Sequence, residues 1–234
     1  MKKLKDFISS IEKISINDEQ IRQFELYYKM LIEKNKVMNL TAITDRDEVI
    51  LKHFIDSIAL AKYYEFSNQK IIDVGTGAGF PGIPLKILFP ELNVTLFDSL
   101  NKRIKFLQEV IDELMLKNIE AVHGRAEEGG RNINMRESYD IAVSRAVANM
   151  AVLSEYCLPF VREGGYFIPY KTSEIDEELD NAKNAISILG GKTEKVEKLD
   201  ISGLGRSFVF IKKIKATPKT YPRKPGTANK QPLI

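Results

Sequence analysis

The chain of 234 residues is long enough for one large domain or two small ones. Hydrophobic residues make up 44% and charged residues 29%, as in an ordinary globular protein, and no apolar run is long enough to span a bilayer. The single cysteine, Cys157, excludes an internal disulfide and a cysteine zinc site. The charged first residues carry no signal-peptide pattern, so we expect a cytoplasmic protein without a membrane partner.

The positive charge is concentrated at one end of the chain. The formal net charge is only +3, but residues 201–234 contain eight Lys or Arg side chains and no Asp or Glu. A gathered positive field is typical of a protein that binds a polyanion such as nucleic acid. A solvated basic tail without a partner gives the same count, so both interpretations stay open.

Residues 1–66 are predicted as a helical region that packs on the domain after it. Asn17 or Asp18 is a suitable N-cap, and apolar residues follow at spacings of three and four: Ile21, Phe24, Tyr28 and Leu31. Residues 36–41 form a polar connector. A second helix is predicted after Thr44, with five residues directed towards a core: Val49, Ile50, Phe54, Ile58 and Leu60.

From Lys70 onward, short runs of branched apolar residues alternate with helical patterns, which indicates βαβ units and a parallel sheet. The predicted strands are 71–74, 94–98, 119–123, 141–144 and 166–170, and the predicted helices are 84–89, 101–116, 149–158 and 175–189. Strands at 192–198 and 207–213 are predicted as an antiparallel pair at the sheet edge. The fold class is therefore α/β, a Rossmann-like core over residues 67–216 with an N-terminal helical extension. Four prolines in residues 217–234 predict a tail without regular structure.

A glycine-rich segment, Asp-Val-Gly-Thr-Gly-Ala-Gly-Phe-Pro-Gly at residues 73–82, lies where the first strand turns into a helix. Glycines there allow a tight turn and let a ligand approach the main chain. A phosphate-binding P-loop would continue with Lys after Gly82, and none follows. A dinucleotide loop that starts at Gly75 and Gly77 would place its third glycine where Phe80 stands. The G-x-G-x-G spacing therefore favours S-adenosylmethionine, which carries no phosphate.

Two carboxylates strengthen this interpretation. Asp73 precedes the loop and is suited to attract the cationic sulfonium or ammonium of S-adenosylmethionine, directly or through water. Asp98 ends the second strand, 19 positions beyond Gly79, where an acid accepts hydrogen bonds from the ribose hydroxyls. Residues 124–128 follow the third strand and are expected to border the adenine. These features together make a bare glycine turn a much weaker interpretation.

The residues after the fourth strand are expected to face the methyl acceptor, because open α/β sheets build sites at strand carboxyl ends. Residues 143–149 lack the Pro-Pro-aromatic run of enzymes that methylate exocyclic amines, and Cys157 lies in an apolar stretch where a core role is expected. Guanine N7 carries no proton, so its methylation needs positioning more than acid–base groups. Arg145 is the candidate catalytic residue, suited to bind guanine O6, a phosphate or the cofactor carboxylate; a structural ion pair is the alternative.

Six short motifs are distributed along the chain. They are residues 38–43, residues 53–57, Gly-Phe-Pro-Gly at 79–82, Arg-Ala-Glu at 125–127, Ser-Arg-Ala at 144–146 and Tyr-Pro-Arg-Lys-Pro-Gly at 221–226. In these the sequence resembles the bacterial small-subunit rRNA guanine-N7 methyltransferases, also called glucose-inhibited division protein B. The resemblance implies transfer of a methyl group to N7 of one guanine in the decoding-region loop of 16S rRNA. It also implies cofactor contacts at Gly75, Phe80, Ala126, Glu127 and Arg145.

For RNA, the basic end and the expected site supply six candidate contacts: His53, Arg125, Lys171, Arg206, Arg223 and Lys224. Residues 217–234 are expected to extend along the RNA. His53 and His123 are too isolated for a metal site, so no metal is expected, and the protein is expected to be a monomer.

Three alternatives remain at this stage. A methyltransferase acting on a small molecule is the nearest. A nicotinamide-dependent reductase is disfavoured by Phe80 and by the lack of a Tyr-x-x-x-Lys pair. A non-catalytic RNA-binding module is disfavoured because Asp98 and the glycines are intact.

Overall fold

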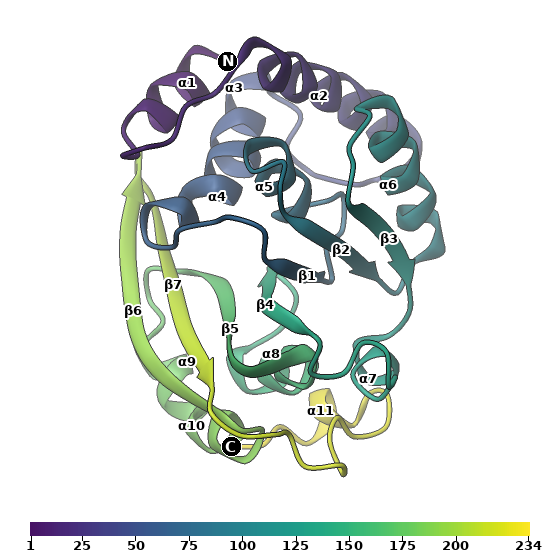
Figure 1. Cartoon of the computed structure of the whole chain (residues 1–234), viewed down its shortest axis with the longest axis vertical. Helices are drawn as coiled ribbons and strands as arrows, with labels where there is room; N and C mark the ends of the chain where they lie inside the picture. Colours follow the sequence, from purple (N-terminus) through teal and green to yellow (C-terminus); the bar gives the residue numbers. More distant parts are fainter.

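The computed structural model describes residues 1–234 and contains a seven-stranded sheet with helices on both faces (Figure 1). The strand order is β3-β2-β1-β4-β5-β7-β6, and β7 is the one strand that runs in the opposite direction to the others. The strands are β1 (Lys70–Val74), β2 (Asn93–Asp98), β3 (Ile119–His123), β4 (Tyr139–Arg145), β5 (Val161–Thr172), β6 (Gly191–Ile201) and β7 (Leu204–Lys213). All seven predicted strands are confirmed, and β5 begins five residues earlier than predicted.

Two hydrophobic clusters, of 37 and 23 buried residues, cover the two faces of the sheet. Neighbouring residues of one strand belong to different clusters, as Ile71 and Ile72 do, because side chains alternate along a strand. The first cluster packs the N-terminal helices with α5 (Gly82–Leu88) and α6 (Asn101–Glu113). The second packs α8 (Met150–Cys157) and α10 (Lys183–Ile188), and it includes Cys157, the expected core residue. Burial on both faces explains why the central strands read as continuous apolar runs.

The N-terminal region begins with α1 (Lys2–Ser9) and α2 (Asp18–Met38). Asn17 is the N-cap of α2 and forms a capping box with Gln20, which confirms the predicted helix start. Tyr27 is fully buried and Tyr28 only half-buried, so the buried stripe departs by one residue from the predicted spacing. The helix runs to Met38, three residues into the predicted connector, and ends where Asn39 adopts a left-handed conformation.

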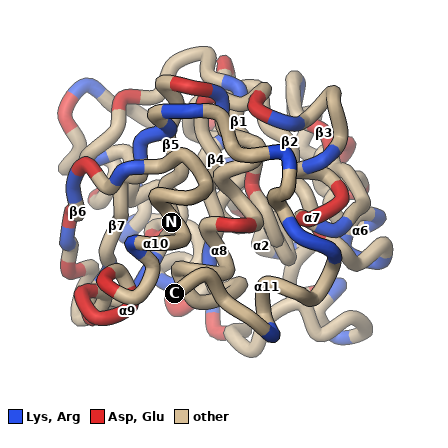
Figure 2. Tube along the Cα trace, turned by 90° about the horizontal axis from the view of Figure 1, so that it is seen from below, with Lys and Arg blue, Asp and Glu red and all other residues tan.

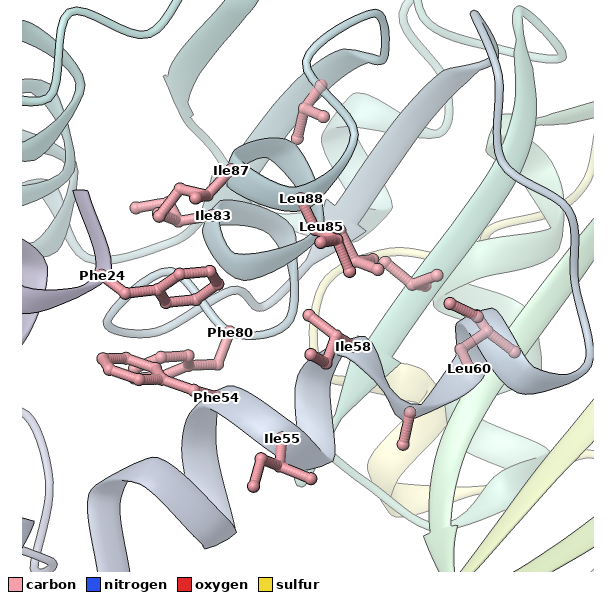
Figure 3. Close-up of a cluster of buried hydrophobic side chains, with 14 of the residues drawn as sticks. Phe24, Phe54, Ile55, Ile58, Leu60, Phe80, Ile83, Leu85, Ile87 and Leu88 are labelled. Carbon is pink, nitrogen blue, oxygen red and sulfur yellow. The ribbon is translucent and has the colours of Figure 1, made fainter. Parts of the chain in front are cut away.

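The helix predicted after Thr44 is confirmed, and all five of its expected core residues are buried. Asp45 caps it, and it comprises α3 (Arg46–Val49), a π turn η1 (Ile50–Ile55), α4 (Asp56–Ile58) and a 3₁₀ turn η2 (Ala59–Lys62). In Figure 3, Phe80 from the glycine loop lies beside Phe54 of this helix and Phe24 of α2. The N-terminal helices therefore hold the glycine loop through aromatic packing.

Two predictions about the second half of the chain were wrong. The helix expected at 175–189 is two helices, α9 (Asp176–Asn181) and α10, because α9 buries no residue whereas α10 packs Ala185 and Ile186 into the core. The tail contains a short helix, α11 (Thr227–Lys230), which starts after Gly226 in a stretch free of proline. The remaining short helices are α7 (Ala126–Gly129) and a 3₁₀ turn η3 (Leu158–Phe160).

The chain after β7 packs back along α7 and α8 (Figure 1). The guanidinium of Arg131 donates to the carbonyls of Thr220 and Pro222. That of Arg136 donates to the carbonyls of three further residues: Thr217, Pro218 and Tyr221. These backbone carbonyls lie outside helices and strands. The side chains of the two arginines supply hydrogen-bond donors for them. The C-terminal segment, residues 217–234, is attached to the domain along its length, and the predicted boundaries at residues 66 and 216 stay predictions.

Half of the basic residues near the C-terminal end of the sequence are paired with acidic residues in the fold. Four of the eight basic residues after position 200 form ion pairs with acidic residues from earlier in the chain: Arg206, Lys212, Lys213 and Arg223. Figure 2 shows acidic positions gathered over α9 and both signs of charge along β6. No helix is both long and apolar enough to cross a membrane.

Candidate active site

The glycine loop connects β1 to α5 and turns on three glycines with positive φ: Gly75 (+72°), Gly77 (+64°) and Gly79 (+106°). At Gly75 a side chain is also excluded by space, because a Cβ there would lie 2.6 Å from Cγ2 of Val147. The N–H groups of Gly75 and Thr76 donate to the carbonyl of Phe97 in β2. The Tyr27 hydroxyl donates to the carbonyl of Ala78 at 2.6 Å. The loop is therefore fixed both by the sheet and by an N-terminal helix.

Asp73 lies one residue before the end of β1, beneath this loop, and is fully buried. Its Oδ2 accepts hydrogen bonds from the Thr76 hydroxyl at 2.7 Å and the Gly82 N–H at 2.8 Å, while Oδ1 has no partner. Burial raises the pKa of Asp73 to about 6, and the two hydrogen bonds oppose that rise. The carboxylate holds the loop and lines neither of the clefts described below, so a contact with cofactor charge stays a prediction.

Asp98 ends β2 beside the loop. Its Oδ2 accepts from the Gly77 N–H at 2.9 Å and lies 3.1 Å from a guanidinium nitrogen of Arg103, and its Oδ1 accepts from the Leu100 N–H. The side chain is only 2% exposed, but it lines a cleft. The acid is therefore held at the carboxyl edge of the sheet by the loop on one side and α6 on the other.

The first cleft, which we call the cofactor cleft, has a volume of about 430 Å³. It runs from the glycine loop over the ends of β2 and β3 to α7 and the C-terminal segment. Four of the predicted cofactor residues line it: Gly75, Asp98, Ala126 and Glu127. Glu127 is 7% exposed, and its carboxylate accepts a hydrogen bond from the N–H of Gly226.

The second cleft, which we call the acceptor cleft, has a volume of about 380 Å³ and opens on the other side of the glycine loop. Gly77, Phe80 and Arg145 of the predicted cofactor residues line it. Three residues, Gly75, Arg103 and Ala146, belong to both clefts. Ala146 has a φ of +58°, an uncommon conformation for a residue with a side chain. The predicted cofactor residues are thus divided between two clefts that meet at the end of β1 and β4.

A buried carboxylate organises the acceptor cleft. Asp56 of α4 is fully buried and accepts hydrogen bonds from the guanidinium groups of Arg145, at the end of β4, and Arg206, near the start of β7. Arg145 also donates to the carbonyl of Lys52. The structural ion pair considered for Arg145 is therefore present, and it fixes the guanidinium at the cleft wall.

A second contact network fixes the aromatic part of this cleft, next to Arg145. His53 stacks on Phe80 with ring centroids 4.6 Å apart, and its Nε2 lies 2.8 Å from the Thr41 hydroxyl. Thr41 is held in turn by two hydrogen bonds with the side-chain amide of Asn35. Burial, and then the charge of Arg145, lower the pKa of His53 to about 4. The imidazole is therefore neutral at physiological pH.

The six predicted RNA contacts lie in different surroundings. His53 and Arg206 line the acceptor cleft, and Arg125 lines the cofactor cleft. Lys171 donates to Glu178 and to the carbonyl of Ala148. Arg223 is half-buried, and its guanidinium is bound by Glu155, which is 1% exposed. Lys224 is exposed. His123 ends β3, and no group of three or more His, Cys, Asp or Glu side chains lies close enough to hold a metal.

The sequence analysis missed several residues that build these clefts: Thr41, Asp56, Arg103, Tyr156, Leu204, Gly226 and Asn229. Three of them, Thr41, Asp56 and Gly226, lie in the motifs at 38–43, 53–57 and 221–226, where the sequence analysis assigned them no role. That membership was the only signal that pointed to them.

The family model of the rRNA small subunit methyltransferase G family, GidB, matches residues 20–207, and so includes the acceptor cleft. The chain belongs to this family. It is 55% identical to ribosomal RNA small subunit methyltransferase G of Lachnoclostridium phytofermentans over 97% of this chain and 96% of that protein. It is 53% identical to the protein of the same name from Alkaliphilus metalliredigens, over 93% and 92% of the two chains.

Solved structures agree on the fold of this family member. A SAM-dependent methyltransferase from Aquifex aeolicus matches 77% of this chain and 97% of its own with a TM-score of 0.54 and 18% identity. M. jannaschii TYW2 in complex with AdoMet matches 74% and 80% with a TM-score of 0.56 and 15% identity. The predicted family, the Rossmann-like fold and the assignment as an S-adenosylmethionine-dependent methyltransferase are confirmed.

Proposed function

We propose that this chain transfers a methyl group from S-adenosylmethionine to N7 of a guanine in the decoding-region loop of 16S rRNA. The observation that supports this most directly is the meeting of the two clefts at Gly75, Arg103 and Ala146. A cofactor in one cleft and a base in the other would have their reacting atoms at this junction. Both clefts lie at the carboxyl ends of the strands, where α/β sheets bind ligands.

Residues of the cofactor cleft and the glycine loop fit S-adenosylmethionine. Asp98 is suited to accept from the ribose hydroxyls, and the glycine loop leaves the main chain open to the ligand. Asp73 lines neither cleft, so we propose that it serves the cofactor by holding the glycine loop through Thr76 and Gly82. When bound, S-adenosylmethionine supplies a methyl group on a sulfonium.

The acceptor cleft supports an acceptor that loses no proton. Its carboxylate, Asp56, is engaged by two guanidinium groups, and the low pKa of His53 makes that imidazole a poor general base near pH 7. Guanine N7 attacks with its own lone pair, so orientation is what the protein must supply. Arg145, fixed by Asp56, is suited to donate to guanine O6, and the Phe80 and His53 rings offer an aromatic surface beside it.

For the RNA backbone we propose contacts from Arg125, Arg206, Lys171 and Lys224, with His53 beside the base. Arg206, Lys171 and Arg223 are weaker candidates than Arg125 and Lys224, because each of the three is already bound by a carboxylate. We also propose that the protein acts as a monomer and in the cytoplasm, where its RNA substrate is made. Sedimentation of the purified protein at working concentration tests the monomer directly.

The decisive experiment is transfer of labelled methyl from S-adenosylmethionine to small-subunit RNA from a strain that lacks this enzyme, followed by mapping of the modified base. We expect label on N7 of a single guanine. Label on another atom would refute the N7 assignment. Cofactor binding with no labelled RNA would refute the RNA substrate and favour a small-molecule acceptor.

A matched pair of variants tests the phosphate contacts. Lys224→Ala is expected to lower the slope of log affinity for RNA against log salt by about one, because one counterion fewer is released. Lys29→Ala, an exposed lysine of α2 outside both clefts, is expected to leave the slope unchanged. Equal slopes for all three proteins would refute the contact at Lys224.

A further inference from the structure

The C-terminal segment is tied to the cofactor cleft by two carboxylates. Glu155 of α8 accepts from both the backbone N–H and the guanidinium of Arg223. Glu127 of α7 accepts from the N–H of Gly226, which has a φ of +81°. Glu127 is itself one of the predicted cofactor residues, so the turn at Gly226 is fixed directly to the cofactor site.

This attachment brings new residues into the cleft wall. Gly226 and Asn229 both line the cofactor cleft, next to Tyr156 of α8. The side-chain amide of Asn229 donates to the Tyr156 hydroxyl at 2.9 Å. Its carbonyl oxygen forms no hydrogen bond in the protein, and the residue is exposed at the cleft. The wall therefore presents one oriented and unused hydrogen-bond acceptor.

The position of this acceptor in the cleft selects a part of the cofactor. Asp98, at the end of β2, marks the ribose, and the cleft continues past β3 to α7 and the C-terminal turn. The part of an adenosine that lies beyond its ribose is the base, whose 6-amino group is a donor. An amide oxygen on the wall is the group that would recognise that donor.

We propose that the C-terminal turn, residues 223–229, forms the adenine-binding wall of the cofactor site, with Asn229 as the residue that selects the 6-amino group. The inference rests on the proposed cofactor but not on the RNA substrate. It gives the C-terminal segment a role in cofactor recognition, while the exposed Lys224 of the same turn keeps the RNA contact proposed above. Arg223 then acts as an anchor that positions the wall through Glu155.

The test compares two ligands in the absence of RNA: S-adenosylhomocysteine and its purine analogue without the 6-amino group, both measured by calorimetry. The native protein is expected to bind S-adenosylhomocysteine about tenfold more tightly than the analogue, the effect of one neutral hydrogen bond. Asn229→Ala is expected to bind both ligands with equal affinity, close to that of the native protein for the analogue. Lys230→Ala, its exposed neighbour on α11, is expected to keep the tenfold preference.

The outcomes separate the two proposals. A native protein that binds S-adenosylhomocysteine without preference over the analogue, or an Asn229→Ala protein that keeps the preference, overturns the adenine wall alone. A native protein that binds neither ligand overturns the proposed cofactor and the wall with it. Thermal melting of Asn229→Ala without ligand, expected to match the native protein, shows that the comparison is made between folded proteins.

Discussion

The backbone N–H of Gly77 donates to the Asp98 carboxylate at 2.9 Å, which joins the glycine loop to the end of β2. The two features that the sequence displays 21 positions apart are therefore one unit in the folded chain. A cofactor that binds to Asp98 meets a carboxylate whose orientation is already set by the loop and by Arg103.

Asp98→Asn is expected to weaken binding of S-adenosylhomocysteine by about 10- to 100-fold. The reason is that hydrogen bonds to a charged acceptor contribute roughly 1.5–3 kcal/mol, and 1.4 kcal/mol corresponds to a factor of ten. Calorimetric titration measures the change, with Asp112→Asn on the exposed side of α6 as the control. Native affinity in Asp98→Asn would show that this acid does not bind the ribose.

Gly75→Ala and Gly77→Ala are expected to differ in stability although both glycines have positive φ. At Gly77 a Cβ meets nothing within 4 Å, so the cost is the left-handed conformation alone, about 1–2 kcal/mol. At Gly75 the Cβ overlaps Val147, which adds roughly 1–3 kcal/mol. Urea unfolding of the two variants measures the difference, and equal losses would mean that Val147 moves away freely.

Asp56→Ala is expected to reduce the free energy of unfolding by about 3–5 kcal/mol, because it leaves two guanidinium groups without their buried carboxylate. Arg206→Ala is expected to cost clearly less, since Asp56 keeps Arg145 as a partner. In the double variant the losses should be less than additive. Denaturant titrations of the native protein, the two single variants and the double variant provide a double-mutant cycle. Strictly additive losses would argue against coupling through Asp56.

His53→Gln is expected to remove part of the acid sensitivity of the fold. The pKa of His53 is about 4 in the folded protein against an ordinary 6.5, so between these values the unfolded chain binds the extra proton. The stability that the neutral ring contributes is present above pH 6.5 and lost as pH falls towards 4, by roughly 2–3 kcal/mol. Unfolding free energies at several pH values should therefore fall less steeply on acidification in His53→Gln than in the native protein.

Asp73 acts in the opposite direction over an overlapping range. Its pKa is about 6 in the folded protein against 3.8, so its contribution is present below pH 3.8 and lost as pH rises through 6. Unfolding free energies of Asp73→Asn are measured at the same pH values. The native protein should lose stability relative to Asp73→Asn as pH rises, whereas it should lose stability relative to His53→Gln as pH falls. Parallel pH profiles for the two variants would contradict both assignments.

The parts of the site that could be predicted are those encoded within a few residues. The loop from Asp73 to Gly82 carries its own turn geometry, and strand alternation located Asp98 at a strand end. The fold followed in the same way, since apolar period and capping residues such as Asn17 are local signals.

What could not be predicted depends on contacts between distant segments. In the sequence, Asp56 is simply a polar residue within a predicted helix. Only the folded chain brings it to Arg206, which lies 150 positions later. Prolines in the C-terminal segment correctly disfavour long regular structure. They contain no information about Arg131 and Arg136, whose guanidinium groups bind that segment to the core.

The attachment of Gly226 to Glu127 has a consequence for the timing of activity during synthesis. Chains leave the ribosome from the N-terminus, and the sheet strands β1 to β5 are available for pairing well before the last residues emerge. The cofactor cleft nevertheless lacks one wall until Gly226 and Asn229 are free of the exit tunnel. A newly made molecule therefore pairs its sheet strands first and gains this wall of the cofactor cleft later, when residues 226–229 reach Glu127 and Tyr156.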